Sequence, residues 1–108
     1  MGGPPREPGA QGMTIRHLAL FEYDETDRAR VEAALAGLRE LPSRIPTIRD
    51  FSLTEDLGHR PGSFRYCLIC YFDTLQQMQD YLAHPAHVAA VERVTPILRK
   101  LAEHDHEV

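Results

Sequence analysis

The hydrophobic and polar positions of the first patterned part of the chain, Thr14–Tyr23, divide into two faces when residues are taken two apart. The odd positions from Ile15 to Tyr23 form one face, and Arg16, Leu18, Leu20 and Glu22 form the other. A period of two residues predicts a β-strand. The next stretch instead spaces its apolar residues three and four apart, at Val31, Ala34, Leu35, Leu38 and Leu41. This spacing predicts an amphipathic helix with Asp24 and Thr26 as candidate caps, and Pro42 and Pro46 are expected to end it.

The rest of the chain is predicted to form two more strands, a helix in two segments and a last strand. Residues 47–57 and 64–72 read as two further strands joined by the Gly- and Pro-containing loop DLGHRPG. Asp73 is a candidate cap for a second helix with an inner stripe of Leu75, Met78, Tyr81 and Leu82. After Pro85 a further helical segment runs through Val88, Val91, Val94 and Leu98, with Pro96 bending or ending it, and residues 101–108 suit a short last strand.

The order β-α-β-β-α-β predicts an α+β fold of the ferredoxin-like type, an antiparallel sheet with helices on one face. We assign this single domain to residues 13–108. Residues 1–12, rich in Gly and Pro, are expected to form a disordered leader.

The first and third predicted strands are apolar on both faces, which is typical of sheets that are covered on both sides. Two helices cover one face only, so we expect the other face to pack on a second copy of the chain. The prediction is a homodimer with enclosed apolar space, suited to a small apolar molecule.

Composition narrows the possible functions. The 108 residues carry a formal net charge of −4 without a basic stripe, which argues against nucleic-acid binding. No apolar run reaches the roughly 20 residues of a membrane span, and the lack of an export signal predicts a cytoplasmic protein. Cys67 and Cys70 have C-x-x-C spacing, but residues three apart on a strand point to opposite faces, so neither a disulfide nor a shared metal is expected.

The segment YLAHPAHVAAV, Tyr81–Val91, holds the candidate chemistry. Pro85 suits the first position of a new helix, so His87 falls in its first turn, where the helix field favours the neutral imidazole. A neutral histidine can act as a base, and Tyr81 can donate a phenolic proton. Spacing alone favours a structural interpretation, in which His87 bonds a backbone carbonyl and His84 is a cap or surface residue.

The other histidines are open to more than one interpretation. His17 lies among apolar neighbours and is either a structural core group or part of a cavity wall. His104 and His106 share a strand face, but no acid–histidine pattern accompanies them. We therefore predict no metal site.

Several segments resemble the stress-responsive A/B barrel domain family: TIRHLALFEYDE, LRELPSRIPTIRDF and YCLICYFDTLQQMQDYLAHPAHVAAVERVTPIL. The resemblance runs from about Met13 to the C-terminus and implies a dimeric α+β barrel. Among the polyketide cyclases of that family, the Tyr and second His of the YxxHPxH segment form a catalytic pair that works without a cofactor. The resemblance carries these roles onto Tyr81 and His87, and substrate-binding roles onto His17, Leu35 and Leu38. Tyr66 stands where those cyclases have a further pocket histidine, so we expect it to bind substrate as well.

Three functions follow from these patterns. The first is a cofactor-independent cyclase or aldolase for a polyketide or related β-dicarbonyl compound, with His87 as base and Tyr81 as its partner. The second is a non-catalytic, stress-responsive dimer that shelters a small molecule. The third, a cofactor-free monooxygenase, is disfavoured because the chain has no tryptophan and no recognisable oxygen-activating group.

Overall fold

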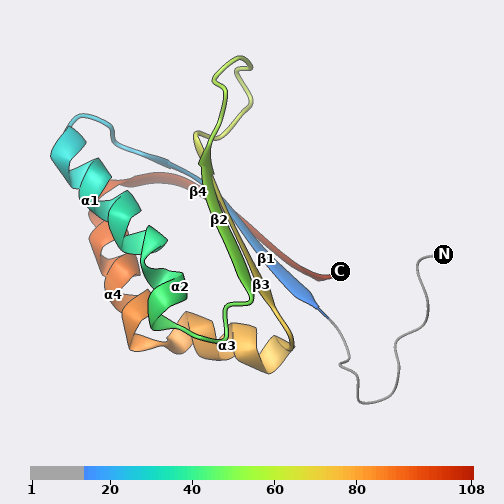
Figure 1. Ribbon diagram of the computed structural model, residues 1–108. Helices are drawn as coiled ribbons and strands as arrows, with labels where there is room; N and C mark the ends of the chain where they lie inside the picture. Colours follow the sequence, from blue (N-terminus) through green and yellow to red (C-terminus); the bar gives the residue numbers. More distant parts are fainter. Residues whose placement is uncertain (1–13) are drawn as a thin grey trace.

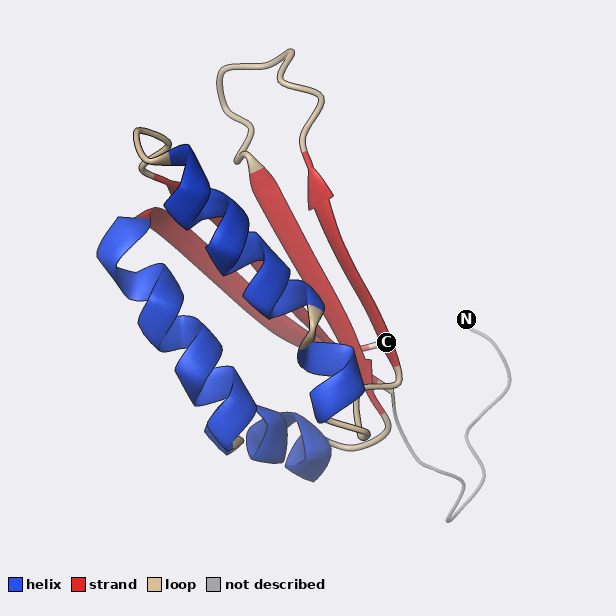
Figure 2. Cartoon of the chain, turned by 60° about the vertical axis from the view of Figure 1, so that its left-hand side comes forward, coloured by secondary structure: helices blue, strands red, loops and turns tan. Residues whose placement is uncertain are grey.

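The computed structural model describes residues 14–108, and the predicted leader lies outside the described residues. The elements are β1 (Ile15–Tyr23), α1 (Arg28–Arg39), α2 (Leu41–Arg44), β2 (Asp50–Glu55), β3 (Tyr66–Phe72), α3 (Leu75–Ala83), α4 (Pro85–Val94), the 3₁₀ turn η1 (Thr95–Ile97) and β4 (Leu98–Glu107). The strands form one sheet in the order β2-β3-β1-β4, with every neighbouring pair antiparallel. All helices lie on one face of this sheet (Figures 1 and 2), which confirms the predicted ferredoxin-like α+β fold.

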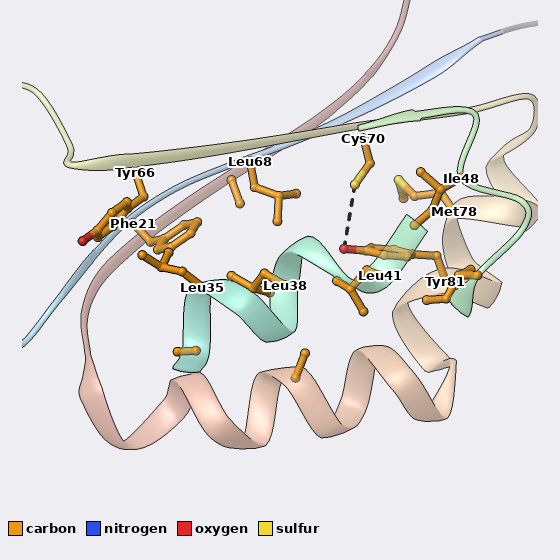
Figure 3. Close-up of a cluster of buried hydrophobic side chains, with 14 of the residues drawn as sticks. Phe21, Leu35, Leu38, Leu41, Ile48, Tyr66, Leu68, Cys70, Met78 and Tyr81 are labelled. Atoms are coloured by element: carbon orange, nitrogen blue, oxygen red, sulfur yellow. Dashed lines mark hydrogen bonds between the residues drawn. The ribbon is translucent and has the colours of Figure 1, made fainter. Parts of the chain in front are cut away.

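Strand alternation separates the sheet into two different faces. The odd residues of β1 and the even residues of β3 are buried under the helices. The core between sheet and helices includes Phe21, Leu38, Leu68, Phe72 and Tyr81, and Figure 3 shows part of it. The apolar stripe predicted for the first helical stretch lies in this core, at Val31, Ala34, Leu35, Leu38 and Leu41.

The start and end of α1 differ from the prediction. Its cap is Asp27, whose side chain accepts a hydrogen bond from the Arg30 amide, while Asp24 accepts one from Thr26 before the helix begins. Pro42 does not end the helical region, because it occupies the first turn of the separate helix α2. A proline is tolerated there since a first-turn N–H has no partner within the helix.

The N-terminal caps of α3 and α4 can both be assigned from side-chain hydrogen bonds. Thr74, rather than Asp73, caps α3 by accepting from the Gln77 amide at 3.1 Å. His84 caps α4 by accepting from the Ala86 amide at 3.0 Å, so its predicted role as a cap is confirmed. The inner stripe of α3 is narrower than predicted, because Met78 and Tyr81 are buried whereas Leu75 and Leu82 are exposed.

The last strand, β4, is longer than predicted, and its pairing with β1 contains a bulge that affects the lining of the cavity described below. The pairing of β1 with β4 shifts between Glu22 and Tyr23, so that Glu22 pairs with Lys100 but Tyr23 pairs with Leu98. A bulge of this kind changes which face successive side chains point to. It allows both Leu98 and Leu101 to point to the helix side, although they lie three residues apart.

The face of the sheet away from the helices, which we call the open face, is half-buried rather than fully exposed. It carries Leu18 and Leu20 of β1 and Cys67, Ile69 and Tyr71 of β3. Cys70, by contrast, is buried on the helix side, and both cysteines are free, as the strand geometry predicted. Among the described residues, no helix has the length and apolar character that crossing a bilayer requires.

Candidate functional site

A cavity of about 320 Å³ lies between the helix side of the sheet and the helices. Four of the six predicted site residues line it: His17, Leu38, Tyr81 and His87. The rest of its wall comes from β1, β3, α4, η1 and β4, at Ala19, Phe21, Tyr23, Leu68, Val91, Val94, Thr95, Leu98, Leu101 and Glu103. The wall is thus mostly apolar, and its titratable side chains are those of His17, Tyr23, Tyr81, His87 and Glu103.

His87 follows the break between α3 and α4, and a hydrogen bond across that break holds its ring in one orientation. Its Nδ1 lies 3.0 Å from the Leu82 carbonyl oxygen, near the end of α3. A carbonyl oxygen can only accept, so Nδ1 carries the hydrogen and, in the neutral ring, Nε2 has the free lone pair. Burial lowers the pKa of His87, and the nearby charge of His17 adds to this effect, while the Leu82 bond opposes it. The sequence predicted a neutral His87, but burial rather than the helix field is the main cause.

The Tyr81 side chain reaches from α3 toward the sheet. It is 1% exposed, and its hydroxyl receives the S–H of Cys70 at 3.9 Å, as Figure 3 shows. Burial raises the pKa of this phenol far above its ordinary value, so Tyr81 remains a neutral donor. Its ring packs against that of His87 with centroids 4.5 Å apart. The pair is therefore in contact through its rings, and Leu82 rather than Tyr81 orients the imidazole by hydrogen bonding.

His17 on β1 is 4% exposed and has a carboxylate partner that the sequence patterns did not reveal. Its Nδ1 lies 2.6 Å from Oδ1 of Asp105, the residue directly opposite on β4. Donation from Nδ1 to this carboxylate turns the other ring nitrogen, Nε2, away from Asp105. The His17 and Tyr81 rings lie 5.8 Å apart, so His17, Tyr81 and His87 form one cluster at this end of the cavity.

Two predicted substrate-binding residues do not line the cavity. The Tyr66 hydroxyl donates to Glu25 at 3.0 Å, and its ring stacks on Phe21. Leu35 is buried in the core. Their neighbours Tyr23 and Leu38 do line the cavity.

The remaining histidines lie outside this cluster. His104 and His106 have ring centroids 5.1 Å apart, and their partners across the sheet, Leu18 and Arg16, belong to the open face. Within residues 14–108, no group of three or more His, Cys, Asp or Glu side chains could hold a metal ion.

A second hollow, of about 670 Å³, lies on the opposite side of the sheet. It is lined by Leu20, Thr54 and Cys67 together with the loop between β2 and β3, at Asp56 and Arg60–Phe64. It contains neither the His87 cluster nor its partners. The larger hollow therefore belongs to the open face, and the smaller one holds the candidate chemistry.

Comparison with known proteins agrees with this architecture. The family model of the stress responsive A/B barrel domain matches residues 15–108. An uncharacterized protein of Streptomyces coelicolor is 31% identical over 80 residues, which cover 71% of this chain and 82% of the relative. Olivetolic acid cyclase of Cannabis sativa is 27% identical over 79 residues, covering 70% of this chain and 78% of the cyclase.

Solved structures show the same arrangement of elements. A dimeric ferredoxin-like protein of Thermobifida fusca superposes with a TM-score of 0.81 and is 28% identical, covering 97% of this chain and all (100%) of that protein.

Proposed function

Because the chain belongs to the stress responsive A/B barrel domain family, we propose that it is a cofactor-independent cyclase or aldolase. Its substrate is a polyketide or a related β-dicarbonyl compound. The observation that carries this proposal is that the neutral His87 and the neutral Tyr81 line one mostly apolar cavity. The likeness to olivetolic acid cyclase supports the reaction type.

The chemistry begins at His87. A proton on a carbon between two carbonyl groups is acidic enough for a neutral imidazole to remove, and Nε2 of His87 has the lone pair for this step. The carbanion so formed attacks a second carbonyl carbon of the same chain. One C–C bond forms, and the C=O π pair becomes an alkoxide on oxygen. The proton on His87 then returns to that oxygen, so the reaction is balanced without an added reactant.

Tyr81 and His17 act on the oxygens of the substrate. The raised pKa of Tyr81 keeps its O–H available as a donor to the oxygen on which charge develops. His17, held through Nδ1 by Asp105, lines the same cavity, and its Nε2 can accept a hydrogen bond from an enol hydroxyl of the substrate. General acid–base help of this kind contributes about 10²–10⁴-fold, and folding the flexible chain against Leu38 and the other apolar walls contributes more.

We also propose that the protein works as a homodimer joined through the open face. The apolar side chains there, Leu18, Leu20 and Ile69, are only half-buried in one chain. An uncovered sheet face of this character favours association. The dimeric state of the Thermobifida fusca protein supports a homodimer. In this dimer the cavity with His87 remains on the helix side of each protomer, away from the partner.

One observation favours a second candidate function. The bond from His87 to the Leu82 carbonyl is also the bond that a purely structural histidine makes. The corresponding function is a non-catalytic dimer that shelters a small apolar molecule in the same cavity.

Turnover by three variants separates the two functions. Wild type, His87→Ala and Tyr81→Phe are tested on a panel of 3,5,7-trioxo acyl thioesters, in which attack of C2 on the C7 carbonyl closes a six-membered ring. His59→Ala, in the exposed loop between β2 and β3, is a matched histidine control. A cyclase loses about 10²-fold or more of its rate in the first two variants, keeps it in the control, and stays dimeric throughout. Tight binding without turnover by wild type would establish the binder instead.

A further inference from the structure

One residue of the cavity wall has a hydroxyl that the fold leaves without a partner. Tyr23, at the end of β1, is 4% exposed and lines the cavity. Within residues 14–108, its hydroxyl oxygen is buried and has no hydrogen-bond partner. Buried polar groups in native proteins are nearly always paired, since an unpaired one weakens the fold. A phenylalanine would fill the same space without this cost, so the hydroxyl calls for a partner from outside the chain.

Tyr23 lies at the end of the cavity opposite to the histidines. It is six residues from His17 on the same strand face, a separation of about 20 Å along the backbone at roughly 3.3 Å per residue. Its ring contacts those of Phe21 and Tyr66, with centroids 5.2 and 5.3 Å away. Figure 3 shows Phe21 and Tyr66 at one end of the buried cluster and Tyr81 at the other. The apolar groups Ala19, Leu38 and Leu68 line the cavity as well.

The bulge in β4 gives this end of the cavity its shape. Tyr23 pairs with Leu98 at the shifted register, and the bulge lets Leu98 and Leu101 both line the cavity. The surroundings of the Tyr23 hydroxyl are therefore set by backbone pairing rather than by a flexible loop.

The charges nearby indicate what the hydroxyl can bind. Burial raises the pKa of Tyr23, with further contributions from Tyr66 and Glu25, so the phenol stays neutral and can donate. The Glu25 carboxylate already accepts from Tyr66 and pairs with Arg28 at 2.7 Å. An anionic ligand group would be repelled by Glu25, whereas a neutral carbonyl or ether oxygen would not.

We propose that Tyr23 is a second ligand-binding group of the cavity, donating a hydrogen bond to a neutral oxygen at the end of the ligand remote from His17 and His87. This inference rests on the proposed function and narrows its substrate class. The substrate is an elongated molecule with the reacting β-dicarbonyl at one end and a further neutral oxygen beyond an apolar stretch, rather than one ending in a plain alkyl tail.

Two probes of equal length test this assignment by calorimetry. Both are 1,3-diketones with a long chain; one chain is plain alkyl, and the other carries a ketone carbonyl near its far end. The affinity ratio of the two probes is measured for wild type, for Tyr23→Phe and for Tyr71→Phe, which removes a phenol hydroxyl from the open face. The ratio should fall by about fivefold in Tyr23→Phe, the effect of one neutral hydrogen bond, and stay unchanged in Tyr71→Phe.

Thermal unfolding of the free protein supplies the second readout. Tyr23→Phe should melt at the wild-type temperature or higher, because it removes an unpaired buried hydroxyl. A melting temperature several degrees lower would reveal a partner within the protein and overturn the inference. Equal probe ratios in wild type and Tyr23→Phe would also overturn it while leaving the proposed function intact. Failure of both diketones to bind wild type would overturn the proposed function and this inference together.

Discussion

The imidazole of His17 is tied to the carboxylate of Asp105, 88 residues later in the chain, by a contact of 2.6 Å. His17 is buried, whereas the Asp105 side chain is 41% exposed, so removing the carboxylate leaves a buried N–H without its acceptor. We expect Asp105→Ala to lower the free energy of unfolding by about 1–3 kcal/mol. Thermal denaturation measures this as a fall of roughly 4–8 °C for each kcal/mol.

Two variants test the cause of this loss. Asp105→Asn keeps an acceptor oxygen and should lose less stability than Asp105→Ala. Glu92→Ala removes an exposed carboxylate from α4 and should change the melting temperature little. An equal loss in all three variants would show that the His17 contact contributes nothing.

The lowered pKa of His87 predicts how stability changes with pH. Above about pH 6.5 neither the folded nor the unfolded state carries this proton. As the pH falls below that value, the unfolded state binds the proton first, so stability declines until the pH reaches the lower folded-state pKa. Melting curves between pH 5 and 8 should therefore show a weaker acid-side decline in His87→Ala than in wild type, and identical declines would contradict the partial burial of this ring.

The same shift predicts the acid limb of catalysis. If Nε2 of His87 is the base, kcat/KM should fall tenfold per pH unit only below the folded-state pKa, which lies beneath the ordinary histidine value. An acid limb centred above pH 6.5 in a full pH–rate profile would exclude His87 as the group that titrates.

A charged side chain on the open face should separate the protomers of the proposed dimer. Ile69→Lys places a charge among the half-buried residues of β3, where it would be desolvated in a dimer. Sedimentation at micromolar protein should show wild type as two chains and Ile69→Lys as one. The control Gln79→Lys, on the exposed side of α3, should remain a dimer. A wild-type protein that sediments as a stable single chain would contradict the proposed assembly.

Substitutions at two neighbouring residues, Thr74 and Asp73, test which of them caps α3. Thr74→Ala removes the oxygen that accepts from the Gln77 amide and should cost about 1 kcal/mol. Asp73→Ala removes only an exposed ion pair with Arg49 and should cost about 0.5 kcal/mol or less. Chemical denaturation of both variants checks the order, and a larger loss at Asp73 would mean that the cap is misassigned.

Local patterns in the sequence were sufficient for the order of elements and for most of the core. The period of two residues separated the two faces of β1, and the proline after His84 located the break between α3 and α4. Which face the helices bury did not follow, because β1 and β3 read as apolar on both faces. The caps were misplaced by one residue at Asp73 and by one to three at α1, because several short polar side chains in a row offer the same oxygen to the backbone.

The parts that the sequence did not reveal depend on pairing between distant strands. Asp105 becomes the partner of His17 only through the register of β1 with β4. The bulge near Leu98 changes which side chains face the helices, and a shift of one residue reverses the two faces of a strand. The unpaired hydroxyl of Tyr23 likewise becomes visible only when every neighbour is placed.

The two faces of β1 have different surroundings. Its odd positions, from Ile15 to Tyr23, lie under the helices, and its even positions lie on the open face. In the proposed dimer, substitutions at odd positions alter what the cavity recognises, while those at even positions alter how strongly two copies associate. Under that proposal, ligand preference and self-association can diverge independently among relatives, even though a single nine-residue strand contributes to both.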